Sequence, residues 1–142
     1  MKQEAQIILG GSFTDQRGTL FFNNDFIMKE IVRFYLIEHP EVSVVRAWQG
    51  HKIEQKWFCV VAGSFKVVLV QPDDWENPSK ELATQEFILK TENCEVLHIP
   101  GGFANGFKAL EPGSKMIVYS DSNVEESAAD NFRFEAAMWY HW

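Results

Sequence analysis

The sequence predicts an all-β fold, built as a closed barrel or a two-sheet sandwich. Many short segments rich in Val, Ile, Phe and Tyr alternate with turn residues, and almost no stretch keeps a helical period. Strands spaced in this way without crossover helices favour a barrel or sandwich, because both arrangements limit exposed sheet edges. The length of 142 residues fits a single domain over residues 1–142, and no repeat or linker divides the chain.

Each predicted strand is a short run of β-branched, aromatic and aliphatic residues bounded by turn-forming residues. Two such runs meet at Gly63, where a glycine can take the unusual dihedral angles of a tight turn, and together they predict a hairpin. Residues 71–80 are rich in Pro, Asp and Asn and predict a long exposed connection. The only predicted helix is Val124–Asp130, with Asn123 as its N-cap. The predicted strands are Thr19–Phe22, Ile31–Ile37, Val42–Trp48, Lys56–Ala62, Ser64–Val70, Gln85–Leu89, Glu95–Ile99, Phe107–Leu110 and Lys115–Ser120.

Charge and hydropathy exclude two classes of partner. With 20 acidic and 13 basic residues, the formal net charge of −7 opposes binding to nucleic acid. No apolar run approaches the roughly 20 residues that a membrane-spanning helix needs, and the first residues lack a signal-peptide core. Cys59 and Cys94 have no disulfide-framework or CxxC spacing, which fits a reducing compartment. We therefore expect a soluble, cytoplasmic protein with no membrane partner.

Five Trp and twelve Phe are many for so short a chain. Bulky rings fill the inside of a small barrel, and this is the simpler interpretation. Rings at a pocket mouth can also stack on a sugar or a nucleobase, as in aromatic-lined ligand sites. Both interpretations apply to Trp48, Trp57 and Trp75.

Two segments concentrate polar residues in an otherwise apolar pattern. The first is Arg46–Lys52, followed by Lys56, and the second is Ile99–Phe107, which reads Ile-Pro-Gly-Gly-Phe-Ala-Asn-Gly-Phe. Together with Asp15–Gly18 and Tyr119–Ser120, they resemble in order and spacing the cupin enzymes related to dTDP-4-dehydrorhamnose 3,5-epimerase and the dTDP-sugar 3,4-ketoisomerases. The resemblance extends over nearly the whole chain.

The resemblance implies a double-stranded β-helix, the jelly-roll barrel of cupins, and a homodimer in which an edge strand near the N-terminus is exchanged. It implies an isomerase that moves a proton beside the ketone of a nucleotide-linked 4-keto-6-deoxyhexose and needs no cofactor. The expected context is the synthesis of sugars for bacterial surface polysaccharides. These enzymes share a framework but differ in the bonds they rearrange, so the resemblance is more specific for the fold than for the reaction.

The resemblance also implies which residues form the site, because several positions of this sequence match the family's motifs. Arg17 and Arg46 match the arginines that contact the diphosphate, and Lys56 matches the lysine that stabilises the enolate oxygen. Gln49 stands where the family has its base histidine, and Asn105 stands where the second motif has a histidine. The resemblance places both amides, and also Tyr119, among the substrate-binding residues.

The substitution by Gln49 changes the chemistry that is available. Removing a proton beside a ketone needs a group that titrates near the working pH, which imidazole does and a carboxamide does not. His51 follows Gln49 by two residues, so both side chains point to the same face of a strand. We therefore predict His51 as the general base and Lys56 as its electrostatic partner. The alternative is that His51 is a hydrogen-bonded residue at the barrel mouth.

Asn105 also has two interpretations. Its amide can donate to a sugar or diphosphate oxygen, or it can satisfy backbone groups of the glycine-rich turn.

A cupin metal centre is the remaining option for these positions. Gln49, His51, Glu54 or Gln55, and Asn105 would be its ligands, but one imidazole among amides is a poor site for zinc, iron or nickel. We predict no bound metal. If the missing histidines abolish turnover, the alternative function is a catalytically degenerate cupin that binds a nucleotide sugar or another carbohydrate.

Overall fold

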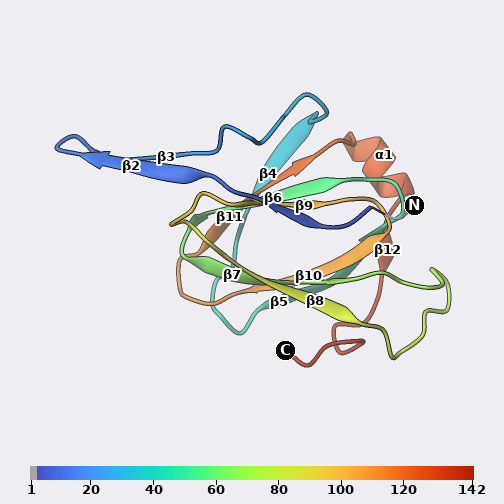
Figure 1. The fold of residues 1–142 in the computed structure, drawn as a ribbon. Helices are drawn as coiled ribbons and strands as arrows, with labels where there is room; N and C mark the ends of the chain where they lie inside the picture. Colours follow the sequence, from blue (N-terminus) through green and yellow to red (C-terminus); the bar gives the residue numbers. More distant parts are fainter. Residues whose placement is uncertain (1–2) are drawn as a thin grey trace.

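The computed structural model describes residues 3–142 as two five-stranded antiparallel sheets that face each other, with a projecting hairpin (Figure 1). The first sheet has the order β1 (Gln6–Ile8), β9 (Val96–Ile99), β6 (Lys56–Ala62), β11 (Lys115–Ser120) and β4 (Arg33–Glu38). The second has the order β12 (Phe132–Arg133), β5 (Val45–His51), β10 (Phe103–Ala109), β7 (Ser64–Val70) and β8 (Thr84–Lys90). The hairpin pairs β2 (Gly11–Asp15) with β3 (Gly18–Phe22), and the helix α1 is Val124–Ala129. The predicted all-β class and jelly-roll architecture are confirmed.

The core lies between the two sheets. Side chains alternate along each strand, so that Val67 and Leu69 of β7 point into this core while Val68 and Val70 point outwards. The core side chains are almost fully buried, and four of them are phenylalanines, which agrees with the expected filling of a small barrel by aromatic rings. The buried core residues are Ile37, Phe58, Val60, Phe65, Val67, Leu69, Leu89, Leu97, Ile99, Phe103, Phe107, Ala109, Met116 and Val118.

The tryptophans lie mainly outside this core. Trp48 projects from the outer face of β5, where the C-terminal segment covers it with Trp139 and Trp142. Two glycines allow rings to lie directly on the sheet: a Cβ on Gly50 would meet Trp75 at 2.6 Å, and a Cβ on Gly106 would meet Trp142 at 2.7 Å. Part of the aromatic excess therefore serves to seal the outer face of the second sheet.

The sequence predicted a hairpin at Gly63, and this prediction is wrong. The turn there is a corner between the two sheets. β6 pairs with β9 and β11, whereas β7 pairs with β8 and β10. Gly63 has a φ of 67°, and a Cβ there would lie 2.1 Å from the Ser114 hydroxyl. Both flanking runs are buried nearly throughout, which fits central strands of two sheets better than a hairpin with one solvated face.

Most predicted strand positions are close to the observed ones, although β5 begins and ends three residues later than the predicted Val42–Trp48. Lys56–Ala62, Ser64–Val70 and Lys115–Ser120 agree in both bounds. β10 begins four residues before the predicted Phe107, because its Gly106 lies inside a paired strand at a bulge instead of ending one. β1, β2 and β12 were not predicted; β1 and β12 are too short to show a period.

The predicted helix and its cap are confirmed. The Asn123 side chain accepts a hydrogen bond from the Glu126 N–H, and the Glu126 carboxylate accepts one from the Asn123 N–H. The long connection after β7 is also confirmed, because no strand or helix lies between Val70 and Thr84. Among the described residues, no helix is long and apolar enough to cross a membrane.

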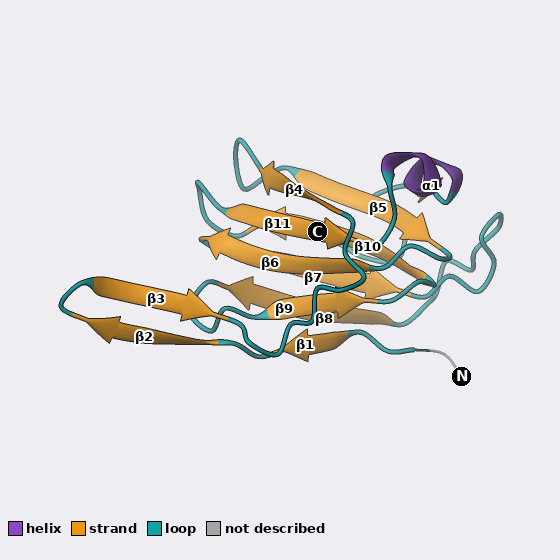
Figure 2. Cartoon of the chain, turned by 90° about the horizontal axis from the view of Figure 1, so that it is seen from above, coloured by secondary structure: helices purple, strands orange, loops and turns teal. Residues whose placement is uncertain are grey.

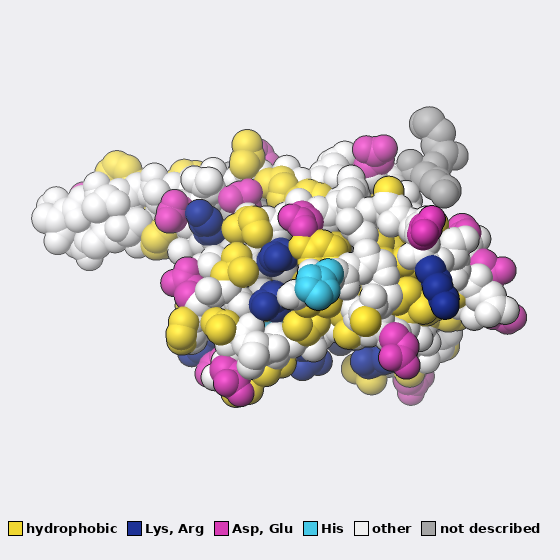
Figure 3. All heavy atoms as spheres, turned by 90° about the horizontal axis from the view of Figure 1, so that it is seen from below, with side chains coloured by type: hydrophobic (Ala, Val, Ile, Leu, Met, Phe, Trp, Pro, Cys, Tyr) yellow, Lys and Arg dark blue, Asp and Glu magenta, His cyan; other side chains and the backbone are white. Residues whose placement is uncertain are grey.

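The β2–β3 hairpin extends from the body as an arm (Figures 2 and 3). All five residues of β3 are exposed, and Phe13, Leu20 and Phe21 are each more than half exposed. β4, an edge strand of the first sheet, likewise exposes Phe34 and Leu36. An apolar surface of this kind is typical of a protein interface.

Candidate functional site

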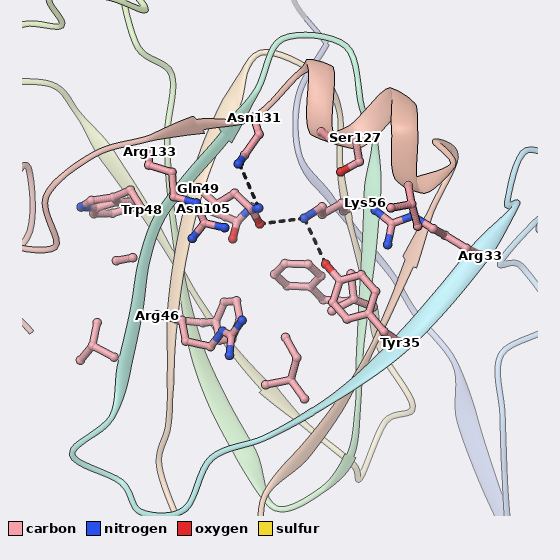
Figure 4. Close-up of a pocket in the computed structure, with 18 residues that line it drawn as sticks. Arg33, Tyr35, Arg46, Trp48, Gln49, Lys56, Asn105, Ser127, Asn131 and Arg133 are labelled. Atoms are coloured by element: carbon pink, nitrogen blue, oxygen red, sulfur yellow. Dashed lines mark hydrogen bonds between the residues drawn. The ribbon is translucent and has the colours of Figure 1, made fainter.

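A cavity of about 560 Å³ lies between the sheets and is capped on one side by α1 and β12 (Figure 4). Its floor is apolar, and its walls carry arginine, lysine, tyrosine and amide side chains. The lining residues are Arg33, Tyr35, Ile37, Val45, Arg46, Ala47, Trp48, Gln49, Lys56, Phe58, Asn105, Phe107, Val118, Val124, Ser127, Ala128, Asn131 and Arg133. A cavity of this size and composition fits a small polar ligand.

The cavity is positively charged although the protein as a whole is negative. Four basic side chains line it, and none of the described lining residues is acidic. Arg33 is neutralised by Glu54 at 3.1 Å. Arg46 and Arg133 have no ion-pair partner in the part of the chain that the structure describes. Two free guanidinium groups at one cavity provide the forked donors that bind phosphate oxygens well.

Lys56 is the most deeply buried of the four basic residues, with 3% of its surface exposed. Its Nζ donates hydrogen bonds to the Tyr35 hydroxyl at 3.1 Å and to Gln49 Oε1 at 3.0 Å. Burial lowers the pKa of Lys56 to about 8, and the positive charges of Arg33, Arg133 and Arg46 add to this effect while Glu54 opposes it. About a tenth of Lys56 is therefore uncharged at pH 7.

Tyr35 brings a hydroxyl group into the same cavity from β4. Burial raises its pKa above the ordinary value, so the phenol keeps its proton at neutral pH. The Arg33 guanidinium lies 5.3 Å from the centre of the Tyr35 ring, and both residues face inwards because they are two apart on a strand. Tyr35 and Lys56 thus form an adjacent donor and amine at one end of the cavity.

Gln49 and Asn105 face each other across the β5–β10 ladder, in the positions where the resemblance expects histidines. Gln49 Nε2 donates to Asn131 Oδ1 at 3.1 Å while Gln49 Oε1 accepts from Lys56, so the amide orientation is set at both ends. Asn105 is 4% exposed and lines the cavity. Neither amide can take up a proton near neutral pH, and no histidine is among the described lining residues.

His51 lies outside the cavity lining, in a buried hydrogen-bond network. Its Nδ1 lies 2.6 Å from the Asp130 carbonyl oxygen, which can only accept, so Nδ1 carries the proton and Nε2 holds a lone pair. Nε2 is buried and has no hydrogen-bond partner among residues 3–142. Burial, and then the charge of Lys56, lower the pKa of His51, so the ring is neutral at pH 7. The proposed base therefore has the right protonation state, but the structure separates it from the cavity surface.

Glu54 links this network to the cavity. Its carboxylate is fully buried and accepts hydrogen bonds from Arg33, from Ser120 and from Ser127 of α1, and it lies 3.2 Å from His51 Nδ1. Burial raises the pKa of Glu54, but the two serine hydrogen bonds and nearby positive charges outweigh burial and lower it overall. Glu54 therefore holds Arg33 and the helix in place as an ionised carboxylate.

Asp130 completes the arrangement at the end of α1. Its two carboxylate oxygens accept the backbone N–H groups of residues 52, 53 and 54, each at 2.8 Å. The loop after β5 is thereby fixed to the segment that caps the cavity. This explains how a short helix with no buried residue stays in position.

Two predicted substrate-binding residues lie elsewhere. Tyr119 packs against Phe26 on the face of β11 that is turned away from the cavity, because its neighbour Val118 takes the inward position. Arg17 lies in the turn of the projecting hairpin, where it pairs with Asp15 at 2.6 Å. The structure thus brings Arg46, Gln49, Lys56 and Asn105 to one cavity, but not Tyr119 or Arg17.

Several cavity residues were not predicted from the sequence. Arg33, Tyr35 and Ile37 alternate along β4, a period-two pattern that would have identified an inward-facing set. Arg133 and Asn131 carry no such signal, because they follow a helix and enter a two-residue strand. Among the described residues, no group of three or more His, Cys, Asp or Glu side chains is placed to bind a metal ion.

No protein-family model matches the chain. A curated relative, a probable low-salt glycan biosynthesis epimerase of Haloferax volcanii, is 29% identical over 115 residues, which cover 78% of this chain and 72% of the relative. The fold is similar to a dTDP-4-dehydrorhamnose 3,5-epimerase of Bacillus anthracis, solved with TDP and pyrophosphate (TM-score 0.76, 22% identity, 94% of this chain and 80% of that chain). It is also similar to a 3,4-ketoisomerase mutant of Thermoanaerobacterium thermosaccharolyticum, solved with TDP-4-keto-6-deoxyglucose (TM-score 0.73, 20% identity, 94% and 90%). The resemblance drawn from the motifs is confirmed by these neighbours.

Proposed function

We propose that the protein is a nucleotide-sugar epimerase or isomerase that transfers a proton beside the ketone of a nucleotide-linked 4-keto-6-deoxyhexose. One observation carries the proposal: Lys56 and Tyr35 lie in hydrogen-bond contact inside a cavity that also holds two arginines without an ion pair among the described residues. Known proteins of this fold act on or bind such sugars, which supports the same substrate class.

The cavity offers a place for each part of this substrate. Arg46 and Arg133 supply bidentate donors for the diphosphate. The floor formed by Phe58, Phe107 and Val118 is apolar and suits the methyl group of a 6-deoxy sugar. The amides of Gln49 and Asn105 supply donors and acceptors for sugar hydroxyls.

The reacting end of the sugar belongs at Lys56. A ketone oxygen near Nζ gains negative charge as the neighbouring proton leaves, and a buried ammonium stabilises that charge strongly because little water screens it. Tyr35, which is protonated and adjacent, can return a proton to the substrate. The assignment of His51 as the base stays a prediction, which requires the substrate to reach its buried Nε2.

The experiment is to incubate the protein with TDP-4-keto-6-deoxyglucose in D₂O and follow the sugar by NMR. We expect deuterium at carbon 3 or 5, together with an epimer or a 3-keto product. If TDP binds but no deuterium is incorporated, the result supports the second candidate function, a protein that binds a nucleotide sugar without turnover. The lack of a histidine among the described lining residues favours this candidate. If TDP does not bind, both functions are refuted.

We further propose that two copies associate through the β2–β3 arm and the exposed edge strand β4. The arm has little contact with its own body yet exposes Phe13, Leu20 and Phe21, and β4 offers an unpaired edge with exposed Phe34. A second copy would cover both surfaces and give Arg17 a route to the partner's cavity. Light scattering should give a dimer mass for the wild type and a monomer mass for Phe34→Glu. A monomeric wild type would refute the proposal.

The free cysteines support a reducing compartment such as the cytoplasm. The proposed proton transfer needs no cofactor.

A further inference from the structure

Lys56 is a buried amine that forms no ion pair with a carboxylate in the part of the chain that the structure describes. Its Nζ contacts only the Tyr35 hydroxyl and the Gln49 carbonyl oxygen among the hydrogen bonds found in the described residues, and none of their carboxylates lies within 4 Å of it. Three arginines line the same cavity and repel its charge. Buried lysines beside other cations are typical of amines that act as nucleophiles.

We propose that Lys56 forms a Schiff base with the ketone of the bound sugar, an inference that rests on the proposed function. The ketone is the reacting group of that substrate, and Lys56 is the only amine among the described lining residues. Gln49, which is held by Asn131, accepts one N–H of Lys56 and fixes the position of the nitrogen.

The steps balance without an added reactant. The lone pair of Nζ adds to the carbonyl carbon, and a proton passes from nitrogen to the new alkoxide to give a carbinolamine. Tyr35 then protonates the carbinolamine hydroxyl, which leaves as water and yields an iminium ion and a Tyr35 phenolate. The phenolate takes the proton from the neighbouring carbon, so the iminium becomes an enamine and Tyr35 regains its hydroxyl. Protonation of the enamine carbon and addition of water then release the ketone and the free amine.

This route explains how the cavity works without the histidine base that the resemblance expects at Gln49. An iminium draws electrons from the neighbouring C–H bond more strongly than a neutral ketone, and the loss of water leaves Tyr35 as a phenolate, a base that can take this proton. With a pKa of about 8, about a tenth of Lys56 is uncharged at pH 7, against about one part in three thousand for an ordinary lysine. The buried environment thus supplies the amine form that the first step needs.

The test traps the iminium in the wild-type protein. Protein and TDP-4-keto-6-deoxyglucose are mixed at pH 7 with sodium cyanoborohydride, which reduces an iminium to a stable amine, and the modified lysine is located by peptide mass spectrometry. We expect the sugar adduct on Lys56 at least tenfold above any other lysine, and its loss when excess TDP is present. Lys66, which donates to Tyr140 on the outer face of the second sheet, serves as the internal control.

Deuterium exchange measured in parallel separates the two proposals. A Lys56 adduct with exchange supports both, and a Lys56 adduct without exchange supports the Schiff base but contradicts turnover. Exchange without a Lys56 adduct overturns the Schiff base and leaves the proposed function standing. An adduct spread evenly over exposed lysines, or neither signal, also overturns the Schiff base. Lys56→Arg, which keeps the charge but cannot form an iminium, should lose at least a hundredfold in exchange rate.

Discussion

Replacing Lys56 by Met should make the protein more stable at pH 7 while removing its activity. The side chains have similar lengths, but Met carries no charge into a site where Lys56 is 3% exposed. The groups that act on the Lys56 charge are Glu54, which favours it, and the three cavity arginines, which disfavour it, with burial as the largest effect. The neutral His51 and Tyr35 add no opposite charge. Lys56 therefore lowers the stability of the fold, and its presence is explained by its role in the activity.

The magnitude follows from the pKa. Lowering the pKa of Lys56 from 10.5 to about 8 means that holding its proton in the folded state costs about 3 kcal/mol at pH 7. Met loses the hydrogen bonds to Tyr35 and Gln49, worth about 1–2 kcal/mol together. The expected net gain is about 1–2 kcal/mol at pH 7. Between pH 8 and 10.5 the unfolded state binds more protons than the folded state, so the wild type becomes more stable as pH rises and the advantage of Met shrinks by about 2 kcal/mol at pH 9.5.

The assay is urea unfolding followed by tryptophan fluorescence at both pH values and constant ionic strength, for wild type, Lys56→Met and Lys66→Met. Lys66 is half-buried on the outer face of the second sheet and controls for the removal of a lysine. If the gain for Lys56→Met is the same at pH 7 and 9.5, or if the variant is less stable than the wild type at pH 7, the buried charge of Lys56 does not destabilise the folded protein.

Three further predictions concern the rest of the site and the fold. Asp130→Ala removes the acceptors of three backbone N–H groups and should lower the free energy of unfolding by about 3 kcal/mol. Asp130→Asn keeps one carbonyl oxygen and should lower the free energy of unfolding by less. Equal losses for the two variants in urea unfolding would contradict this prediction. Arg46→Ala should weaken TDP binding about 10–100-fold in calorimetry, since it deletes a charged hydrogen-bond donor, and an unchanged affinity would remove Arg46 from the diphosphate site. Gly63→Ala places a Cβ at a φ of 67° and against Ser114, so it should lower the free energy of unfolding by more than about 1 kcal/mol. A smaller loss would show that the corner between the sheets tolerates a Cβ.

The sequence predicted the strands where the local pattern and the tertiary environment agree. Lys56–Ala62 and Ser64–Val70 are long, apolar runs, and both were located to the residue. The relation between them was wrong, because a glycine turn with φ near 67° suits a hairpin and a corner equally well, and only the pairing with distant strands decides between them.

The cavity residues that the sequence did predict are those that the motifs marked. Arg46, Gln49, Lys56 and Asn105 were found through the motifs that carry the family resemblance, and all four line the cavity. Arg133 reaches the cavity through the C-terminal segment, whose path no local pattern specifies. Strand alternation predicted that His51 faces the cavity together with Gln49. His51 is the last residue of β5, and its side chain contacts Asp130 and Glu54 instead.

The initial rate of deuterium uptake by TDP-4-keto-6-deoxyglucose tests the central claim, that this cavity moves a proton beside a ketone. We expect uptake with the wild type and with Lys66→Met, and a loss of at least a hundredfold with Lys56→Met even though that variant is the more stable protein at pH 7. Equal uptake by Lys56→Met and wild type would show that the chemistry lies outside the cavity that Lys56 and Tyr35 share.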